Sequence, residues 1–281
     1  MLKNENTDMS FKFLQWNTLA TSCCDEQAFP KVSKASLGWD KREQLFIKIF
    51  KEQNPSILCL QEVDNIDQFV KILQTLNPNY KYFYEQKIRP TMENIHQGIA
   101  IFYDSSMFTP QSMKRNNYVQ INKKPLNQFN LAVIFIHNKS KKVVELITTH
   151  LISNKDNFET RTFEVSELIK VHDDINLTFE KDGVQSYAKI ICGDFNAEPD
   201  EEGIILMKNR KDLKSVFEDA TFTTYKMRDK TLKRVIDYIF YGGCLEIESR
   251  TELCTDLPEF GYPSEQFPSD HLMLACTFKL N

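Results

Sequence analysis

The stretch "IICGDFNAEPDEEG", residues 190–203, passes from an apolar run into a polar and then an acidic segment. Ile190 to Gly193 is typical of a buried strand, and Asp194 and Asn196 follow where that strand should end. Acidic side chains favour the positive N-terminal end of a helix, so residues 198–202 indicate a helix start rather than metal ligands. The stretch therefore predicts a strand that ends in polar groups and leads into a helix.

The same arrangement of apolar runs predicts the rest of the secondary structure. We expect a helix that starts at the cap residue Asp40 and stops before Pro55, and a hairpin that turns at 138–142. The remaining strands are expected at 11–17, 56–64, 80–87, 98–104, 187–194, 234–241 and 272–280, and the remaining helices at 66–73 and 157–173. Hairpins mixed with βα crossovers favour a layered α/β sandwich over a purely parallel doubly wound sheet.

Composition places the chain among globular proteins. The 281 residues include 41% hydrophobic and 26% charged residues, which is typical of a globular protein. The polar start of the chain predicts a flexible arm at 1–10, and the length predicts a single domain at 11–281. Seven cysteines without CxxC spacing indicate reduced thiols, and no apolar run reaches the ~18 residues that span a bilayer. We therefore expect a protein of the cytoplasm, with the nucleus as the alternative.

Charge and glycine content exclude several functions. The net charge of −4 gives no global attraction to nucleic acid or to an anionic membrane, so a phosphate-rich ligand needs a local site. Neither GxGxxG nor GxxxxGK[ST] occurs, which excludes the dinucleotide-binding and P-loop folds.

Several predicted strands finish in, or contain, a polar residue. Most of these residues alone have an ordinary explanation as a turn former, a helix cap or a buried histidine. The exception is Asp237, because burying a carboxylate inside a strand without a partner costs about 2–7 kcal/mol. The residues are Asn17, Glu62, His150, Asp194, Asn196, Asp237, Asp270 and His271.

Together these residues suit the hydrolysis of a phosphoester. That reaction needs a hard cation, a base for the attacking water and donors for the phosphate oxygens. Glu62, helped by Asn17, would suffice for Mg²⁺, which keeps several of its waters, and Mn²⁺ could replace it. The two histidines suit a base and a phosphate donor, and Asp270 could orient His271 if "SDH" forms a turn.

Six ordered motifs join these residues: "QWNTLA", "LCLQEVD", "TTHL", "CGDFNAEP", "IDYIFY" and "PSDHL". The chain thereby resembles the exonuclease–endonuclease–phosphatase superfamily, which includes deoxyribonuclease I. Through "LGWDKREQ", "FTTYKMR" and "YPSEQFPSDHL" it is most similar to the branch of nocturnin-type and carbon-catabolite-repression-type deadenylases.

The resemblance implies a four-layer sandwich of two mixed sheets flanked by helices, with the site at the edge of the sheets. It also implies Mg²⁺ on Glu62 with Asn17 and Asp237 beside it. The expected catalytic residues are His150, Asp194, Asn196, Asp237 and the Asp270-His271 pair, and the expected substrate-binding residues are Lys87, Arg228 and Asn17.

The chain departs from the nocturnin pattern at two positions after His150. Ile152 and Asn154 stand where basic residues are usual, and residues 97–100 read "QGIA" in place of Asp-Gly-Cys-Ala. A phosphate monoester is close to a dianion whereas an internal RNA diester carries one charge, so losing two cations favours the diester. Lys87 and Arg228, or a rearranged Lys155 or Arg161, could offset that loss.

These observations predict an enzyme of the 3′-5′ exoribonuclease type that acts on poly(A)-like RNA 3′ ends. The alternatives are removal of the 2′-phosphate from NADP(H), a phosphatase for inositol phosphates or sphingomyelin, and an inactive adaptor, which would have no chemical need for so many site residues. The expected partner is an RNA 3′ end or an adenine dinucleotide. We expect a monomer with no membrane contact and no leucine-rich-repeat docking module.

Overall fold

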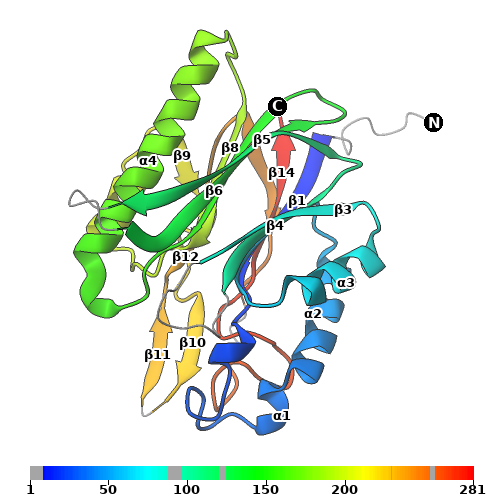
Figure 1. Ribbon diagram of the computed structural model, residues 1–281, viewed down its shortest axis with the longest axis vertical. Helices are drawn as coiled ribbons and strands as arrows, with labels where there is room; N and C mark the ends of the chain where they lie inside the picture. The colour runs from blue at the N-terminus through cyan, green and yellow to red at the C-terminus, as the bar shows by residue number, and fades with distance from the viewer. Residues whose placement is uncertain (1–8, 88–96, 120–124, 229, 254–256) are drawn as a thin grey trace.

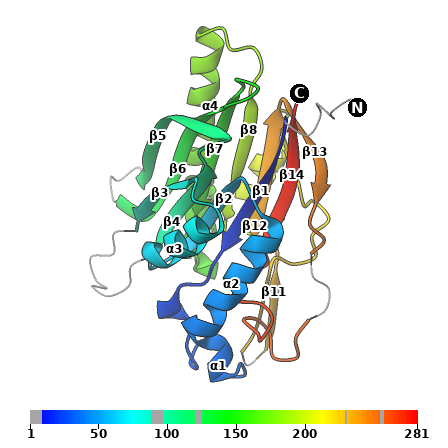
Figure 2. The same ribbon diagram turned by 90° about the vertical axis from the view of Figure 1, so that its right-hand side faces the viewer.

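Two mixed β-sheets lie face to face, with helices on both outer sides (Figures 1 and 2). The computed structural model describes residues 9–87, 97–119, 125–228, 230–253 and 257–281. The first sheet has the strand order β13 (Leu245–Arg250), β14 (Leu274–Leu280), β1 (Ser10–Asn17), β2 (Ile57–Val63), β4 (Gly98–Asp104) and β3 (Tyr80–Gln86). The second has the order β5 (Phe108–Val119), β6 (Pro125–His137), β7 (Val143–His150), β8 (Ala188–Asp194), β12 (Asp237–Gly243) and β9 (Leu213–Ser215).

Each sheet contains a parallel pair among antiparallel neighbours. β1 runs parallel to β2, and β7 runs parallel to β8. β14 is antiparallel to β1, and β12 is antiparallel to β8. In each sheet, the C-terminal ends of the two parallel strands therefore lie beside the N-terminal end of an antiparallel neighbour, which is β14 in the first sheet and β12 in the second.

The core between the sheets consists of alternate residues of both inner faces. Phe13 and Cys59 of the first sheet belong to the same buried cluster as Ile190 and Ile239 of the second. Burying such side chains contributes about 1.5–3 kcal/mol each, and the alternation of inward residues fixes the register of each strand.

The helices cover the outward faces. α2 (Trp39–Gln53) and α3 (Ile66–Leu76) pack on the first sheet, where Phe46 contacts Trp16 with ring centroids 5.1 Å apart. α4 (Phe158–Lys181) and α5 (Glu202–Lys208) pack on the second. The expected four-layer sandwich is thus confirmed.

Some local expectations are corrected. Gly38 is the N-cap of α2, and Asp40 lies in its first turn. α4 runs to Lys181, eight residues past the expected end at Asp173. Asp237 is the first residue of β12, not an interior one. The strand β5 was not expected, because its sequence is mostly polar at an exposed sheet edge.

Besides the 3-10 helices η2 (Thr21–Cys23) and η3 (Lys155–Asn157), three short elements lie near one end of the sandwich. α1 (Lys34–Leu37) precedes α2, and β10 (Thr224–Met227) pairs with β11 (Thr231–Arg234) as a separate two-stranded hairpin. Both views show the hairpin at the same lower end of the molecule as α1 (Figures 1 and 2).

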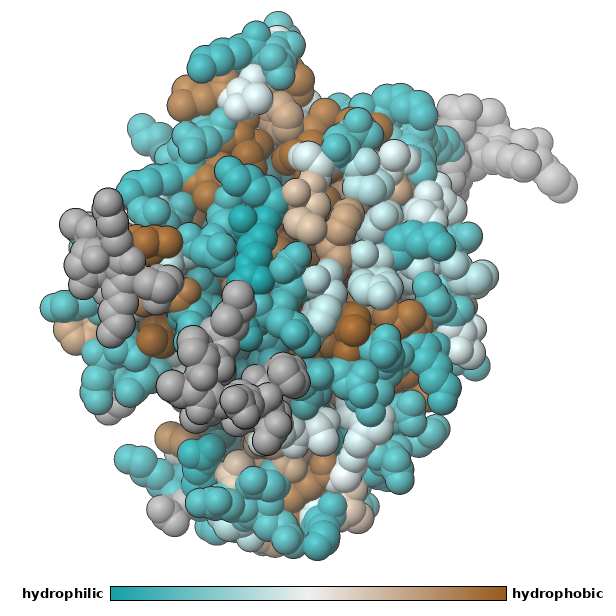
Figure 3. Space-filling model, in the orientation of Figure 1, coloured by the Kyte–Doolittle hydropathy of each residue, from teal (hydrophilic) through white to brown (hydrophobic). Residues whose placement is uncertain are grey.

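The first residues of the chain bear on the predicted arm. β1 already includes Ser10, and the rest of the expected arm at 1–8 lies outside the described residues. The six described cysteines are free thiols, five of them buried, as expected. Among the described helices, none has the length and apolar character to cross a bilayer. On the face in Figure 3, hydrophobic residues form separate patches within a mainly hydrophilic surface.

Candidate active site

The predicted site residues meet at one edge of the sandwich because of the strand directions. Asn17, His150 and Asp194 end β1, β7 and β8, and Asp237 begins β12. In the register, Asp194 lies beside both His150 and Asp237. Residues from opposite ends of the sequence therefore come together on rigid strands.

Glu62 owes its direction to an irregularity in β2. The pairing of β2 with β4 shifts between Gln61 and Val63, and Glu62 has a φ of 58°. Such a bulge re-aims a side chain that regular pleating would point elsewhere. The backbone N–H of Ala20 donates to Glu62 Oε2 at 3.1 Å, and the side chain keeps 18% of its surface exposed. Glu62 thus presents a held, accessible carboxylate.

Asn17 connects two carboxylates. Its Nδ2 donates to Glu62 Oε1 at 3.1 Å and to Asp194 Oδ2 at 2.9 Å, while its Oδ1 accepts from the backbone N–H of Leu19 at 3.0 Å. An amide nitrogen is not a metal ligand, so a ligand role for Asn17 requires its amide to turn over. In this arrangement Asn17 fixes the spacing of the two carboxylates.

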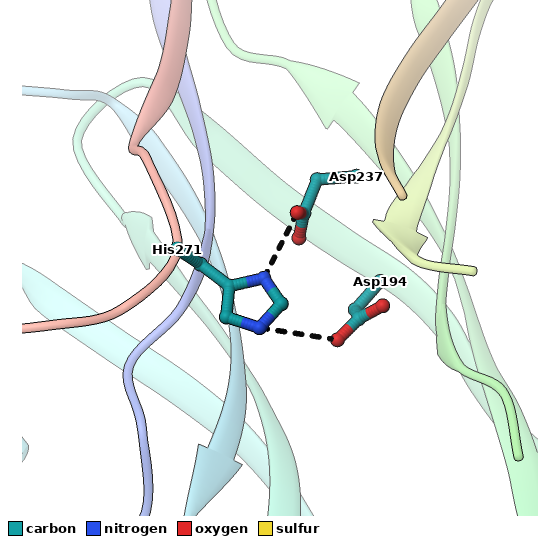
Figure 4. A group of neighbouring side chains, drawn as sticks. All are labelled: Asp194, Asp237 and His271. Carbon is teal, nitrogen blue, oxygen red and sulfur yellow. Dashed lines mark hydrogen bonds and ion pairs between the residues drawn. The ribbon is translucent and has the colours of Figure 1, made fainter. Parts of the chain in front are cut away.

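A histidine lies between two aspartates at the centre of the site (Figure 4). His271 Nδ1 lies 2.9 Å from Asp237 Oδ2, and His271 Nε2 lies 3.8 Å from Asp194 Oδ2. Thr223 donates to Asp237 Oδ2 at 2.7 Å and so holds the carboxylate in place. The first ring nitrogen is therefore hydrogen-bonded, whereas the second faces Asp194 across a gap longer than a hydrogen bond.

This geometry corrects the expected pairing of Asp270 with His271. Asp270 Oδ2 lies 2.6 Å from Lys226 Nζ, and the residue that orients His271 is Asp237. The "SDH" segment does turn, but its backbone is held by Ser269 and Trp16: Ser269 Oγ donates to Asn17 O, and Trp16 Nε1 donates to His271 O. Sequence neighbours thus send their side chains to different partners.

The electrostatics follow from this burial. Burial and the charge of Asp237 raise the pKa of Asp194 to about 6. Burial alone would lower the pKa of His271, but the carboxylates of Asp237, Asp270 and Asp194 raise it to about 10. The ammonium of Lys226 and the charge of His271 outweigh burial and lower the pKa of Asp270. A protonated imidazole facing an ionised Asp194 is consequently favoured near neutral pH.

The second histidine lies at the other side of Asp194. His150 Nε2 is 3.6 Å from Asp194 Oδ2 and 3.9 Å from Glu62 Oε1. The close approach of β7 and β8 at this point requires Gly193, because a Cβ there would lie 2.1 Å from Thr149 O. The glycine of "CGDFN" thus allows His150 and Asp194 to lie side by side.

Asn196 stands just beyond β8 with a left-handed φ of 50°. Its backbone N–H donates to Asp194 Oδ1 at 2.8 Å, and its Nδ2 donates to Leu151 O at 3.1 Å. Asn196 therefore lies beside Asp194 and orients that carboxylate through the backbone.

The predicted substrate cations lie outside the central cluster. Arg228 is exposed, and its Nε donates to Ala28 O at 3.1 Å. Lys87 is 5% exposed, and its charge acts on Glu164, whose pKa burial raises to about 7 against the opposing effects of the Ile152 N–H, Lys87 and Arg161. Their roles with substrate stay predictions.

Arg161, which could offset the missing cations only by rearranging, is engaged by other groups in this structure. It is 2% exposed, lies 2.7 Å from Glu201 Oε2 through Nη2, and donates to Asn154 O at 2.6 Å. It therefore holds the chain after His150 in place. The side chain of Lys155 lies outside what the structure describes.

Several supporting residues were not singled out from the sequence. Gln15 Nε2 donates to Gln61 Oε1 at 2.7 Å, and Arg42 donates to Pro268 O at 2.7 Å and to Thr18 O at 2.6 Å. Both glutamines are buried polar residues inside apolar strands, close before Asn17 and Glu62, and that signal could have revealed them. Arg42 had no such signal, because its position on α2 looks like an ordinary helix surface.

Two sheets packed between helices, with carboxylates and imidazoles gathered at one edge, define a class of hydrolytic phosphoesterases. The chain belongs to the Endonuclease/Exonuclease/phosphatase family, whose model matches residues 14–271.

Among its relatives, nocturnin of Rattus norvegicus is 28% identical over 290 residues, covering 96% of this chain and 66% of that protein. The CCR4-Not complex 3'-5'-exoribonuclease subunit Ccr4 of Kluyveromyces lactis is 25% identical over 345 residues, covering 100% of this chain and 42% of that protein. The chain thus spans less than two thirds of either relative.

A solved structure supports the same grouping. The human nocturnin catalytic domain with bound sulfate anion superposes with a TM-score of 0.76 at 26% identity, covering 97% of this chain and 95% of that one.

Proposed function

We propose that this protein is a divalent-metal-dependent phosphodiesterase that removes nucleotides from RNA 3′ ends, with Mg²⁺ as the metal and Mn²⁺ as a substitute. The observation that carries the proposal is the convergence of Glu62, His150, Asp194 and the Asp237–His271 pair at one edge of the sandwich. Relatives named as nocturnin and as a 3'-5'-exoribonuclease subunit support the choice of reaction.

The residues present fit a divalent cation. Carboxylates gather in the site, and burial together with the nearby charge of Asp237 raises the pKa of Asp194. The oxygen-rich set suits Mg²⁺, and we assign Glu62 as its main ligand because that carboxylate is the accessible one. Asp194, Asp237 and His271 also lie within ligand distance of one another, but His271 is already bonded to Asp237 and holds a proton, which makes it a poor ligand. When bound, the cation would polarise the phosphate and stabilise developing negative charge.

The chain's own groups supply the proton chemistry. Ionised Asp194 takes a proton from, or orients, the attacking water. Asp237 fixes the Nδ1 proton of His271, so that Nε2 faces the same space as Asp194. His150 and Asn196 complete the set as donors to phosphate oxygens.

The uncharged residues at positions 152 and 154 favour a singly charged phosphate as substrate. Ile152 and Asn154 supply no charge, and Arg161 is occupied by Glu201 and backbone carbonyls. This supports a phosphodiester over a phosphomonoester dianion as substrate. Location in the cytoplasm or nucleus, a monomeric state and a single catalytic domain at 11–281 stay predictions of the same proposal.

A 2′-phosphatase acting on NADP(H) is the second candidate. The retention of Lys87 and Arg228, which match basic positions of nocturnin-type sequences, favours it.

A two-substrate assay separates the candidates. The protein is incubated with Mg²⁺ and either a 5′-labelled oligoadenylate or NADPH. We expect stepwise shortening of the RNA, abolished by EDTA and reduced by about 10²–10⁴-fold in Glu62→Gln. Stoichiometric phosphate release from NADPH with intact RNA would replace the exonuclease with the phosphatase, and wild-type activity in Glu62→Gln would refute the assigned metal ligand.

A further inference from the structure

The hairpin of β10 and β11 concentrates positive charge in a chain whose net charge is −4. Its residues 224–234 contain five cations, Lys226, Arg228, Lys230, Lys233 and Arg234, against the single carboxylate of Asp229. Two of these are neutralised, because Lys226 pairs with Asp270 at 2.6 Å and Arg234 pairs with Glu198 at 2.9 Å.

The other three cations are exposed to solvent. Among the described residues, no carboxylate forms an ion pair with Arg228, Lys230 or Lys233. Lys233 Nζ lies 5.5 Å from the ring centroid of Phe222 and 5.3 Å from that of Tyr225. These rings hold the Lys233 ammonium in a defined place while its outer side stays in water.

The hairpin is continuous with the active site. Thr223, directly before β10, donates to Asp237, and the backbone N–H of Tyr225 donates to Asp270 O at 2.9 Å. From this base the hairpin extends to the end of the molecule away from the sheets (Figure 1). Lys233 lies on β11 and Lys230 directly before its first residue, so the chain between them spans at most about 10 Å, at ~3.3 Å per residue. The cations therefore lead outward from the catalytic edge.

Resting on the proposed function, we propose that this hairpin is a docking surface for the phosphate backbone of the single-stranded RNA upstream of the cleaved end. Lys230 and Lys233 would each neutralise a backbone phosphate, and the strand would run from the catalytic cluster along β11. The surface serves a polyanion that reaches beyond the pocket, which a small nucleotide does not. Charge complementarity and continuity with the site carry this assignment.

The test is a binding measurement that does not depend on turnover. Wild type and Lys230→Glu/Lys233→Glu are titrated, with Mg²⁺ present, against a fluorescent oligoadenylate of about 20 nucleotides with phosphorothioate linkages at its 3′ end. We expect the double variant to bind about tenfold more weakly at low salt. The slope of log affinity against log salt should fall by about 1.4, since each phosphate contact on a single strand contributes about 0.7.

The control carries the same charge change elsewhere. Lys181→Glu/Lys211→Glu alters exposed lysines at the end of α4 and next to Asp212, and it should keep the wild-type salt slope apart from a small general effect. Circular dichroism and melting curves verify that both double variants are folded.

Each outcome decides the assignment. Equal affinity and slope for wild type and the hairpin variant, or an equal loss in the control, would overturn it even if wild type shortens RNA. Binding that is lost in the hairpin variant, together with no RNA shortening by wild type, would leave the docking surface standing and refute the proposed reaction. Tighter binding to phosphatidylserine vesicles than to RNA, lost in the same variant, would assign the hairpin to a lipid surface and overturn the RNA assignment.

Discussion

In two buried histidines of this protein each ring nitrogen faces a different carboxylate, but only one of the two borders a reactive space. His271 lies between Asp237 and Asp194 at the edge of the sheets, and His172, on the buried face of α4, lies between Glu145 and Asp212. The residue types are the same in both clusters. The difference between them therefore shows what burial and partner geometry add to chemistry.

Both ring nitrogens of His172 are engaged in the cluster under α4. His172 Nδ1 lies 2.7 Å from Glu145 Oε1, and His172 Nε2 lies 3.0 Å from Asp212 Oδ2, which also receives Lys189 Nζ at 3.0 Å. Both ring nitrogens have partners within hydrogen-bond distance, and His172 itself has no exposed surface. The imidazole therefore joins α4 to the second sheet and has no ring nitrogen left for a substrate.

The catalytic cluster keeps one interaction incomplete. His271 Nε2 stands 3.8 Å from Asp194 Oδ2, a gap longer than a hydrogen bond, and Asn17 links Asp194 to the partly exposed carboxylate of Glu62. A group that is held on one side and open on the other can exchange a proton with a bound substrate or water. The comparison teaches that an unsaturated, oriented imidazole marks the reactive cluster, whereas the residue types alone do not.

The largest expected effect contrasts the two aspartates near His271. Asp237→Asn should lower turnover by about 10²–10⁴-fold, because the ring loses the carboxylate that orients it and stabilises its charge. Asp270→Asn should lower turnover by only about tenfold or less, since Asp270 pairs with Lys226 while the ring of His271 stays oriented by Asp237. Initial rates on oligoadenylate measure both. A greater loss in Asp270→Asn would restore the pairing expected from the sequence.

The next effect concerns stability rather than rate. His172→Ala should lower the free energy of unfolding by about 3–5 kcal/mol, because Glu145 stays buried without its partner. His271→Ala should instead abolish most activity with a smaller loss of stability, because Asp237 keeps its hydrogen bond from Thr223. Urea unfolding and initial rates of both variants test the contrast. If His172→Ala unfolds at the wild-type urea concentration, the cluster under α4 is not a structural anchor.

The smallest effect is the pH dependence of the anchor. Burial lowers the pKa of His172, but Glu145 and Asp212 outweigh it and raise the pKa above its ordinary 6.5. A raised pKa in the folded state means that the protonated ring adds stability below pH 6.5, and that this contribution disappears as the pH rises through the raised value. The difference in unfolding free energy between wild type and His172→Gln should therefore shrink from pH 6 toward alkaline pH. A difference that grows with pH would mean that His172 is buried in its neutral form.

Most of the fold was predictable because its signals are local. Apolar alternation located the strands around Phe13, Ile190 and Leu274, and helical spacing located α2 and α3. The polar edge strand β5 escaped prediction because a strand paired on one side needs little apolar sequence. The site residues at the strand ends were predicted by position, and the structure brings six of them to one edge: Asn17, Glu62, His150, Asp194, Asp237 and His271.

By itself, the sequence determined the class of fold and the side chains available to its site, because strand periodicity and the residues that end each strand are local features of the sequence. Only the tertiary structure decided which of these groups interact. Asp237 reaches His271 across 34 positions while the adjacent Asp270 turns to Lys226, and Arg161 is held by Glu201 instead of facing a substrate. The physical reason is that pairing depends on side-chain direction and strand register, which neighbours in sequence do not share.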